Sequence, residues 1–365
     1  MWRCLAVVLG SFLHFALAGC ASGGGGSTVG SERLFAIMPH EAEASSPLQE
    51  LFTSERPLVF TLEADFDQLT RDRAQDNEER PARVFLPGPG GDSLELPLKV
   101  RTRGNFRLRR DICPFPPLRL NFPSAAVAGT VLEGQDKLKL VTHCREQEFH
   151  EQNVVEELLA YRIYNQLTEV GFRVQLAFIT YLDTSGRNRP LSRLAFLIED
   201  EGRMAARLDG QMLEVAQAAP DQFHQRQAGI MYLFQYMIGN TDWSMAAFHN
   251  VKVARIGTDY FPIPYDFDFS GLVNAPYAGP NPALAHLHSS VRERLYRGFC
   301  SDRIDFDEIF GLYQDKRGPI LEMIRTQPGF SQRSVSTAAR YIEDFYRELD
   351  NPERFKSMIR QQCGR

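Results

Sequence analysis

The sequence predicts an α+β protein of two lobes: a β-rich N-terminal lobe with one long helix, and a mainly helical C-terminal lobe with a small β-hairpin. Three observations predict this fold class. Short apolar runs separated by Pro- and Gly-rich turns recur up to about residue 200, as strands do. Among them, residues 151–168 carry apolar side chains at helical spacing. Beyond residue 200, helical spacing prevails.

Composition limits the class of protein and of partner. The chain has 365 residues, enough for two domains at roughly 100–200 residues each. Hydrophobic residues make up 43% and charged residues 24%, which argues against collagen-like, disordered and multi-span membrane proteins. Forty-one Lys and Arg against 46 Asp and Glu leave a net charge of −5. No nucleic-acid partner is expected, because such binders neutralise phosphates with a surplus of positive charge.

Residues 1–19 are expected to be a secretory signal peptide. Arg3 precedes an apolar stretch that is too short to span a bilayer comfortably. The stretch ends on Leu-Ala-Gly-Cys, residues 17–20, which resembles a bacterial lipobox. The resemblance implies a lipoprotein whose Cys20 is acylated, with palmitate among the attached chains, and becomes the new N-terminus. Its contact with the membrane would run through this lipid.

Residues 20–45 include a Gly- and Ser-rich run and are expected to form a flexible linker between the lipid and the folded part. No acidic residue directly follows Cys20. In a two-membrane bacterium this pattern resembles that of lipoproteins sent on to the outer membrane. The expected location is therefore the bacterial cell envelope, at the periplasmic face of the outer membrane or at the cell surface rather than at the inner membrane.

Four cysteines remain once Cys20 carries lipid. An even number of thiols in an oxidising envelope is expected to pair. Of the three possible pairings we favour the one that places a bridge in each lobe, Cys113–Cys144 and Cys300–Cys363. A metal site is the alternative, although no Cys-x-x-Cys spacing supports it.

The elements follow one another in a defined order. In the predicted N-terminal lobe, residues 46–200, strands are expected at 58–64, 84–86, 94–100, 118–122 and 137–141, then the helix at 151–168, then strands at 174–181 and 194–198. In the predicted C-terminal lobe, residues 201–365, we expect a helix at 222–238, a hairpin of strands at 251–256 and 260–265, and three or four helices within 301–363, including 334–349. This is the order expected of a protein-kinase-like bilobal fold.

The densest cluster of chemically useful side chains lies in residues 238–271. Asp242 follows a helix, Asn250 opens the hairpin, and Asp266 and Asp268 come just after it. Phosphoryl transfer needs a carboxylate near the acceptor hydroxyl, plus an Asn and an Asp that hold magnesium on the nucleotide phosphates. The hairpin would fold Asn250 and Asp266 back towards Asp242, and alternation puts Asp266 and Asp268 on one side of an extended segment. The alternative is that these residues only cap turns.

Residues 99–271 resemble the CotH kinase family, atypical kinases related to the spore-coat protein CotH. The resemblance implies that Asp242 is the catalytic acid/base, Asp266 the principal metal ligand, Asn250 a second ligand and Asp268 a helper. It also implies Mg (or Mn) and ATP or another nucleotide as cofactors. One departure is that eight residues separate Asp242 from Asn250, whereas ordinary kinases place these two roles five apart.

The residues that would bind the nucleotide precede this cluster. Lys137 and Lys139 lie two apart on a predicted strand, so both face one side of it, and either could clamp phosphates. The long helix offers Glu156 and Glu157 as the ion-pair partner of such a lysine, and kinase analogy favours Lys139 with Glu157. The alternative is that these are charges of an edge strand and a helix surface. Arg103 belongs to an arginine-rich hairpin, which either covers phosphates or grips an acidic substrate, or forms a solvated basic edge.

Two main functions compete. The first is an envelope-located CotH-like kinase that transfers phosphate from a nucleotide to a protein or glycan hydroxyl with magnesium. Outside the inner membrane there is no evident supply of ATP, so the second is a non-catalytic lipoprotein that keeps the kinase-like fold as a binding or scaffold module, with calcium at Asp266 and Asp268 as one option. The presence of Asp242, Asn250 and Asp266 together favours the kinase, because a scaffold needs none of them. A third hypothesis is a metal-dependent hydrolase that uses the same carboxylates on water.

Overall fold

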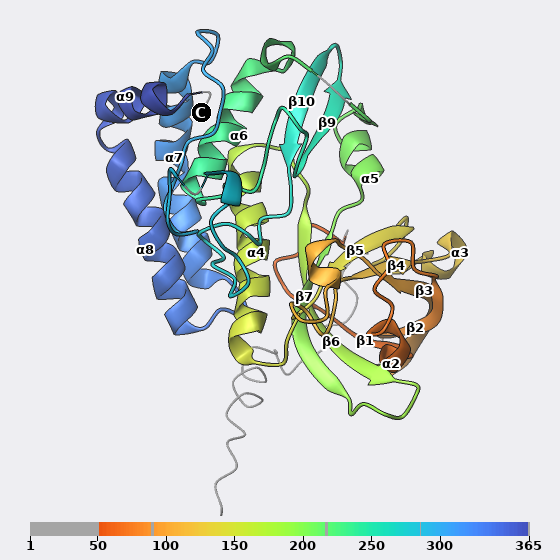
Figure 1. The fold of residues 1–365 in the computed structure, drawn as a ribbon. Helices are drawn as coiled ribbons and strands as arrows, with labels where there is room; N and C mark the ends of the chain where they lie inside the picture. The colour runs from red at the N-terminus through yellow and green to blue at the C-terminus, as the bar shows by residue number, and fades with distance from the viewer. Residues whose placement is uncertain (1–50, 89–90, 216–217, 285, 364–365) are drawn as a thin grey trace, which may run out of the picture. The chain divides into compact units, whose positions relative to one another are not determined.

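The strands come early along the chain and most of the helices come late (Figure 1). The computed structural model describes residues 51–88, 91–215, 218–284 and 286–363. The predicted signal peptide, Cys20 and the predicted linker lie outside the described residues. Over the ranges described, no helix has both the length and the apolar character needed to cross a bilayer.

Seven strands of the described residues close into a barrel in the order β1-β2-β3-β4-β5-β7-β6. Their bounds are Leu58–Ala64 (β1), Arg80–Pro87 (β2), Ser93–Thr102 (β3), Leu118–Asn121 (β4), Lys137–Val141 (β5), Val174–Asp183 (β6) and Leu191–Ile198 (β7). Neighbours pair antiparallel except β1 and β6, which pair parallel from Leu58 with Ala177 to Ala64 with Asp183. Alternate side chains of each strand therefore fill the interior, as Val84 and Leu86 do on β2.

The closed barrel shows that the predicted fold class, a bilobal protein-kinase-like arrangement, is wrong. The predicted strands exist, but they do not form the open sheet of a kinase lobe. The barrel closes through β1 and β6, strands that lie on either side of the long helix in the sequence. Alternation within a strand reports which face is buried and carries no information about which distant strand it pairs with. The predicted limits of the lobes stay a prediction.

Two hydrophobic cores hold the described residues together. One fills the barrel and includes Leu62, Val100 and Leu138, all fully buried. The other surrounds the long helix α4, Glu148–Leu167, whose buried residues occupy nearly every side of it. This second core also takes in the late helices α6 (Gln225–Met237), α7 (Phe306–Thr326), α8 (Gln332–Leu349) and α9 (Pro352–Gln362). The long helix thus packs against helices that come much later in the sequence.

A second, three-stranded sheet has the order β10-β9-β8. The strands β9, Val251–Ile256, and β10, Asp259–Pro264, form the predicted hairpin to within a residue. The strand β8, Gly210–Leu213, and the short helix α5 before it, Glu201–Ala206, were not predicted. Two other short helices are α2 (Phe66–Leu69) and α3 (Ser124–Val127).

Both predicted disulfides are confirmed. Cys113 is bonded to Cys144, with Cα atoms 4.7 Å apart, and Cys300 to Cys363, with Cα atoms 5.5 Å apart. The first bridge links the segment between β3 and β4 to the residues just before α4. The second fixes the end of α9.

Candidate functional site

Asp242 lies in a short loop that the end of α6 positions. Gly239 leaves the helix at a positive φ of 64°, and a side chain there would collide with the hydroxyl of Tyr341. Asn240 Oδ1 then accepts a hydrogen bond from the backbone N–H of Asp242 at 2.9 Å. Arg297 donates to the carbonyls of the residues on either side of Asp242. The loop backbone is therefore held both from within and from the late part of the chain.

The carboxylate of Asp242 is fixed at both oxygens. Asn250 Nδ2 donates to Oδ2 at 3.1 Å and also to the Asp242 carbonyl at 2.7 Å. His249 Nε2 lies 3.2 Å from Oδ1. About a third of the Asp242 side chain stays exposed, so an acceptor group can reach it.

The hairpin places Asn250 opposite the residue before Asp266. Pro264 pairs with Val251, and just beyond this pair the N–H of Tyr265 donates to the Asn250 carbonyl at 3.2 Å. Asn250 and Asp266 both have a positive φ, which turns the chain sharply out of the strands. The N–H of Asp266 donates to the hydroxyl of Tyr161 on α4 at 2.9 Å.

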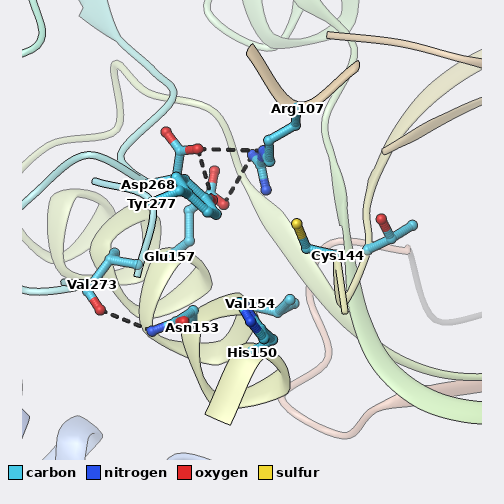
Figure 2. Close-up of a pocket in the computed structure, with 10 residues that line it drawn as sticks. Arg107, Cys144, His150, Asn153, Val154, Glu157, Asp268, Val273 and Tyr277 are labelled. Carbon is cyan, nitrogen blue, oxygen red and sulfur yellow. Dashed lines mark hydrogen bonds and ion pairs between the residues drawn. The ribbon is translucent and has the colours of Figure 1, made fainter. Parts of the chain in front are cut away.

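Arg107 is the central cation of the site, although it was not among the predicted site residues. Its Nε lies 3.3 Å from Asp268 Oδ2, and its Nη2 lies 3.3 Å from Glu157 Oε2 and 3.7 Å from Asp266 Oδ1. Tyr277 donates to Asp268 Oδ2 at 3.0 Å (Figure 2). The only sequence feature that could have pointed to Arg107 is the run of arginines that contains it. Such a run is also typical of a solvent-exposed basic edge of a sheet.

Burial raises the pKa of Glu157 and that of Asp268, although Arg107 lowers both. The two carboxyl groups contact the same guanidinium, so their titrations depend on one another.

A small hollow that opens to solvent lies beside this cluster. Its walls combine apolar and charged side chains from the barrel, α4 and the hairpin: Arg103, Arg107, Lys139, Val141, Glu157, Tyr161, Phe172, Ile198, Tyr265 and Asp266. Three of the four residues predicted to bind a nucleotide, and the principal predicted metal ligand, thus line one space.

Lys139 projects from β5, and its partner differs from the expected one. The predicted ion pair between Lys139 and Glu157 is not formed. Lys139 Nζ lies 2.7 Å from Glu201 Oε1, and Lys252 approaches the other oxygen of Glu201 at 3.4 Å. Glu201 belongs to α5, the helix that was not predicted, while Glu157 is occupied by Arg107. Lys137 does not line the hollow and lies 3.6 Å from the exposed Asp136.

Arg103 is the other cation that lines the hollow. Within the ranges that the structure describes, its guanidinium forms no hydrogen bond or ion pair. Burial lowers its pKa and so does the neighbouring Arg107, whereas Asp266 raises it. An unpaired guanidinium at the wall of an accessible space is suited to an anionic ligand, because its donors have nothing else to bind.

The residues fit magnesium only in a limited way. No group of three or more His, Cys, Asp and Glu side chains is arranged to hold a metal in the described part of the chain. Asp268 is held by Arg107 and Tyr277, and the amide nitrogen of Asn250 is turned towards Asp242. The side chain of Asp266 is 43% exposed. Its Oδ1 lies 3.7 Å from Arg107 Nη2, a longer distance than those from Arg107 to Asp268 and Glu157. Magnesium bound with nucleotide phosphates takes one or two carboxylates, so Asp266 fits as its ligand.

The comparisons with known proteins do not identify a family. No protein-family model matches the chain, and no curated protein matches it. Among solved structures, the chain is similar to the proinflammatory kinase CtkA of Helicobacter pylori, at 10% identity and a TM-score of 0.39, over 67% of this chain and 94% of that one. A TM-score this low does not establish a shared fold. The resemblance to the CotH family stays a prediction.

Glu156, beside Glu157 on α4, makes the stability of the protein depend on pH. It is buried, accepts a hydrogen bond from Asn153 at 2.8 Å, and its pKa is raised by burial from 4.5 to about 8. The native state therefore holds a proton that the unfolded chain releases above about pH 4.5. Its contribution to stability is complete below that pH and is lost as the pH rises through about 8.

Glu156→Gln should remove this part of the pH dependence. The loss of unfolding free energy between pH 5 and pH 8 is expected to shrink by roughly 1–3 kcal/mol, measured by urea unfolding. Glu148→Gln, on an exposed position of the same helix, is the control and should change little. An unchanged pH dependence in Glu156→Gln would show that Glu156 is ionised in the native protein.

Proposed function

We propose that the protein is a magnesium-dependent phosphotransferase of the CotH type, which moves a phosphoryl group from ATP or another nucleotide to a hydroxyl of a protein or glycan. One observation carries the proposal. The unpaired guanidinium of Arg103 shares a hollow with Lys139, with the half-exposed carboxylate of Asp266 and with an apolar wall. Cations suit phosphates, a carboxylate suits the metal that accompanies them, and the apolar wall suits a base.

In this proposal the nucleotide binds in the hollow. Arg103 and Lys139 bind the phosphates, and Lys139 leaves Glu201 to do so. Phe172 and Tyr265 provide aromatic surface for the base. Asp266 would hold Mg (or Mn), with Asn250 beside it. The metal, when bound, neutralises charge on the transferred phosphoryl group.

The acceptor hydroxyl would bind at Asp242. Asn250, which lies beside the proposed metal ligand Asp266, donates a hydrogen bond to the Asp242 carboxylate. Its carboxylate orients the acceptor hydroxyl and receives the proton that the hydroxyl loses. Asp268 and Glu157 take no part in proton transfer in this proposal. They bind Arg107, which thereby connects α4 to the segment after the hairpin.

The proposal also places the protein in the cell envelope, anchored through acylated Cys20. The lipobox-like sequence and the two disulfides support it, because disulfides persist in oxidising compartments. The occupied state of Lys139, paired with Glu201, is the observation that favours the non-catalytic alternative. Nucleotide binding without any transfer would favour that alternative.

Lys139→Met should weaken nucleotide binding, whereas Lys137→Met should not. The two lysines lie two residues apart on β5, but Lys139 lines the hollow and Lys137 does not. Loss of one charge-assisted phosphate contact is expected to raise the Kd for ATP·Mg by about tenfold or more, measured by isothermal titration calorimetry. Equal effects of both substitutions would exclude the hollow as the phosphate site.

Asp242→Asn and Asp266→Asn should fail in different ways. Asp266→Asn removes charge from the metal ligand, so both nucleotide affinity and transfer should fall. Asp242→Asn should keep nucleotide affinity and lose transfer by ~10²-fold or more, the effect of a positioned acid/base group. Calorimetry with ATP·Mg, paired with mass spectrometry of autophosphorylation, separates binding from transfer.

Two outcomes would contradict the assignment. If the wild-type protein binds no nucleotide at millimolar concentration with either magnesium or manganese, the proposed function fails. If Asp242→Asn loses the nucleotide while Asp266→Asn keeps it, the two roles are exchanged.

A further inference from the structure

The segment between β3 and β4, residues 103–117, carries both arginines of the candidate site. Arg103 begins this arginine loop, and Arg107 lies in its 3-10 turn, Phe106–Leu108. The ends of the loop meet where the N–H of Arg103 donates to the carbonyl of Pro117 at 2.9 Å. Whatever fixes the loop therefore fixes two of the cations that face the hollow.

Hydrogen bonds to the loop come from two arginines outside it. Arg73 donates to the carbonyls of Leu108, Cys113 and Pro114 at 3.2, 2.9 and 2.7 Å. Arg145 donates to the carbonyls of Ile112, at 3.0 Å, and Asp111. Neither arginine is buried, so water competes for these bonds and each contributes modestly.

Arg107 lines two small hollows. One is the hollow that Arg103 and Lys139 also line. The other is a second hollow, which Glu157 lines as well (Figure 2). Cys144 lines this second hollow together with His150 and Asn153. The position of this guanidinium in both hollows depends on its ion pairs and on the backbone of the arginine loop that carries it.

The disulfide and the buried ion pair join the same two segments. Cys113 binds Cys144, which precedes α4, and Arg107 meets Glu157 on α4. Burying an ion pair costs desolvation, and the attraction offsets this cost only when the geometry is held. A covalent link removes most of the chain entropy that would otherwise be lost in bringing the arginine loop to the helix.

We propose that the Cys113–Cys144 disulfide is the positioning element of the phosphate site, so that the site is assembled only in the oxidised protein. This inference rests on the proposed function. Formation of the bond takes two protons and two electrons from the two thiols, and the disulfide of a thiol–disulfide oxidoreductase accepts them and leaves as a dithiol. The chain before export, with both thiols reduced, has a released arginine loop and a weak phosphate site.

The second disulfide of the chain provides a matched control. The double variant Cys113→Ser/Cys144→Ser should bind ATP·Mg at least about tenfold more weakly than wild type, by calorimetry, because cations are lost from the hollow wall. The double variant Cys300→Ser/Cys363→Ser loses a bridge that closes a longer loop and touches neither hollow. Its affinity should stay within about twofold of wild type, a change of a few tenths of a kcal/mol. Equal losses in both variants would mean that general destabilisation is the cause and would overturn the proposal.

A second measurement tests the proposal even if Cys113→Ser/Cys144→Ser does not fold. In Cys300→Ser/Cys363→Ser, the remaining disulfide is reduced in the folded protein with a phosphine, and mass spectrometry follows the thiols. Nucleotide affinity should fall in proportion to the reduced fraction. Affinity that is unaffected by complete reduction would overturn the proposal and leave the proposed function standing.

Hydrogen exchange separates this inference from the proposed function. Amides of residues 106–113 should lose protection on reduction, whereas those of α4 keep it, with or without nucleotide. If wild type binds no nucleotide, the proposed function fails, and loss of protection confined to the arginine loop still supports the positioning role. Retained protection after reduction would show that hydrogen bonds alone hold the loop.

Discussion

The arrangement of the site depends on one buried guanidinium. Arg107 is shared by Glu157 from the long helix and by Asp266 and Asp268 from the segment after the hairpin. These acidic residues lie far apart in the sequence and would repel one another without a cation between them. Removing that cation would leave carboxyl groups buried without a partner, which is strongly destabilising. The position of the hairpin against α4 therefore depends on a residue that the barrel supplies.

Each of the three structural units contributes a distinct part of the hollow. The barrel contributes Lys139 and, through the arginine loop, two guanidinium groups. The helix α4 contributes Glu157 and the hydroxyl of Tyr161, which anchors the backbone of Asp266. The hairpin contributes Asp266 and holds Asn250 against Asp242. The charged groups of the site therefore come from three parts of the fold that lie far apart in the sequence.

The local elements could be predicted from the sequence, and the long-range pairings could not. Strand alternation, the helical period of α4 and the turn at Gly257 gave the hairpin and most barrel strands, since each is a property of neighbouring residues. Barrel closure by β1 and β6 and the pairing of Lys139 with Glu201 join distant segments, about which periodicity says nothing. Arg107 resembled its exposed neighbours in the same run. The disulfides were predictable because four cysteines allow only three pairings and one of these keeps each bridge within one half of the chain.

The central claim is that the hollow beside Arg107 binds the phosphates of a nucleotide. Its most direct test is a crystal structure of the protein with magnesium and an ATP analogue whose terminal phosphate cannot be transferred. We expect phosphate oxygens within about 3 Å of Arg103 and Lys139, with the metal on Asp266. A hollow that stays empty at millimolar analogue, or a nucleotide bound elsewhere on the protein, would contradict it.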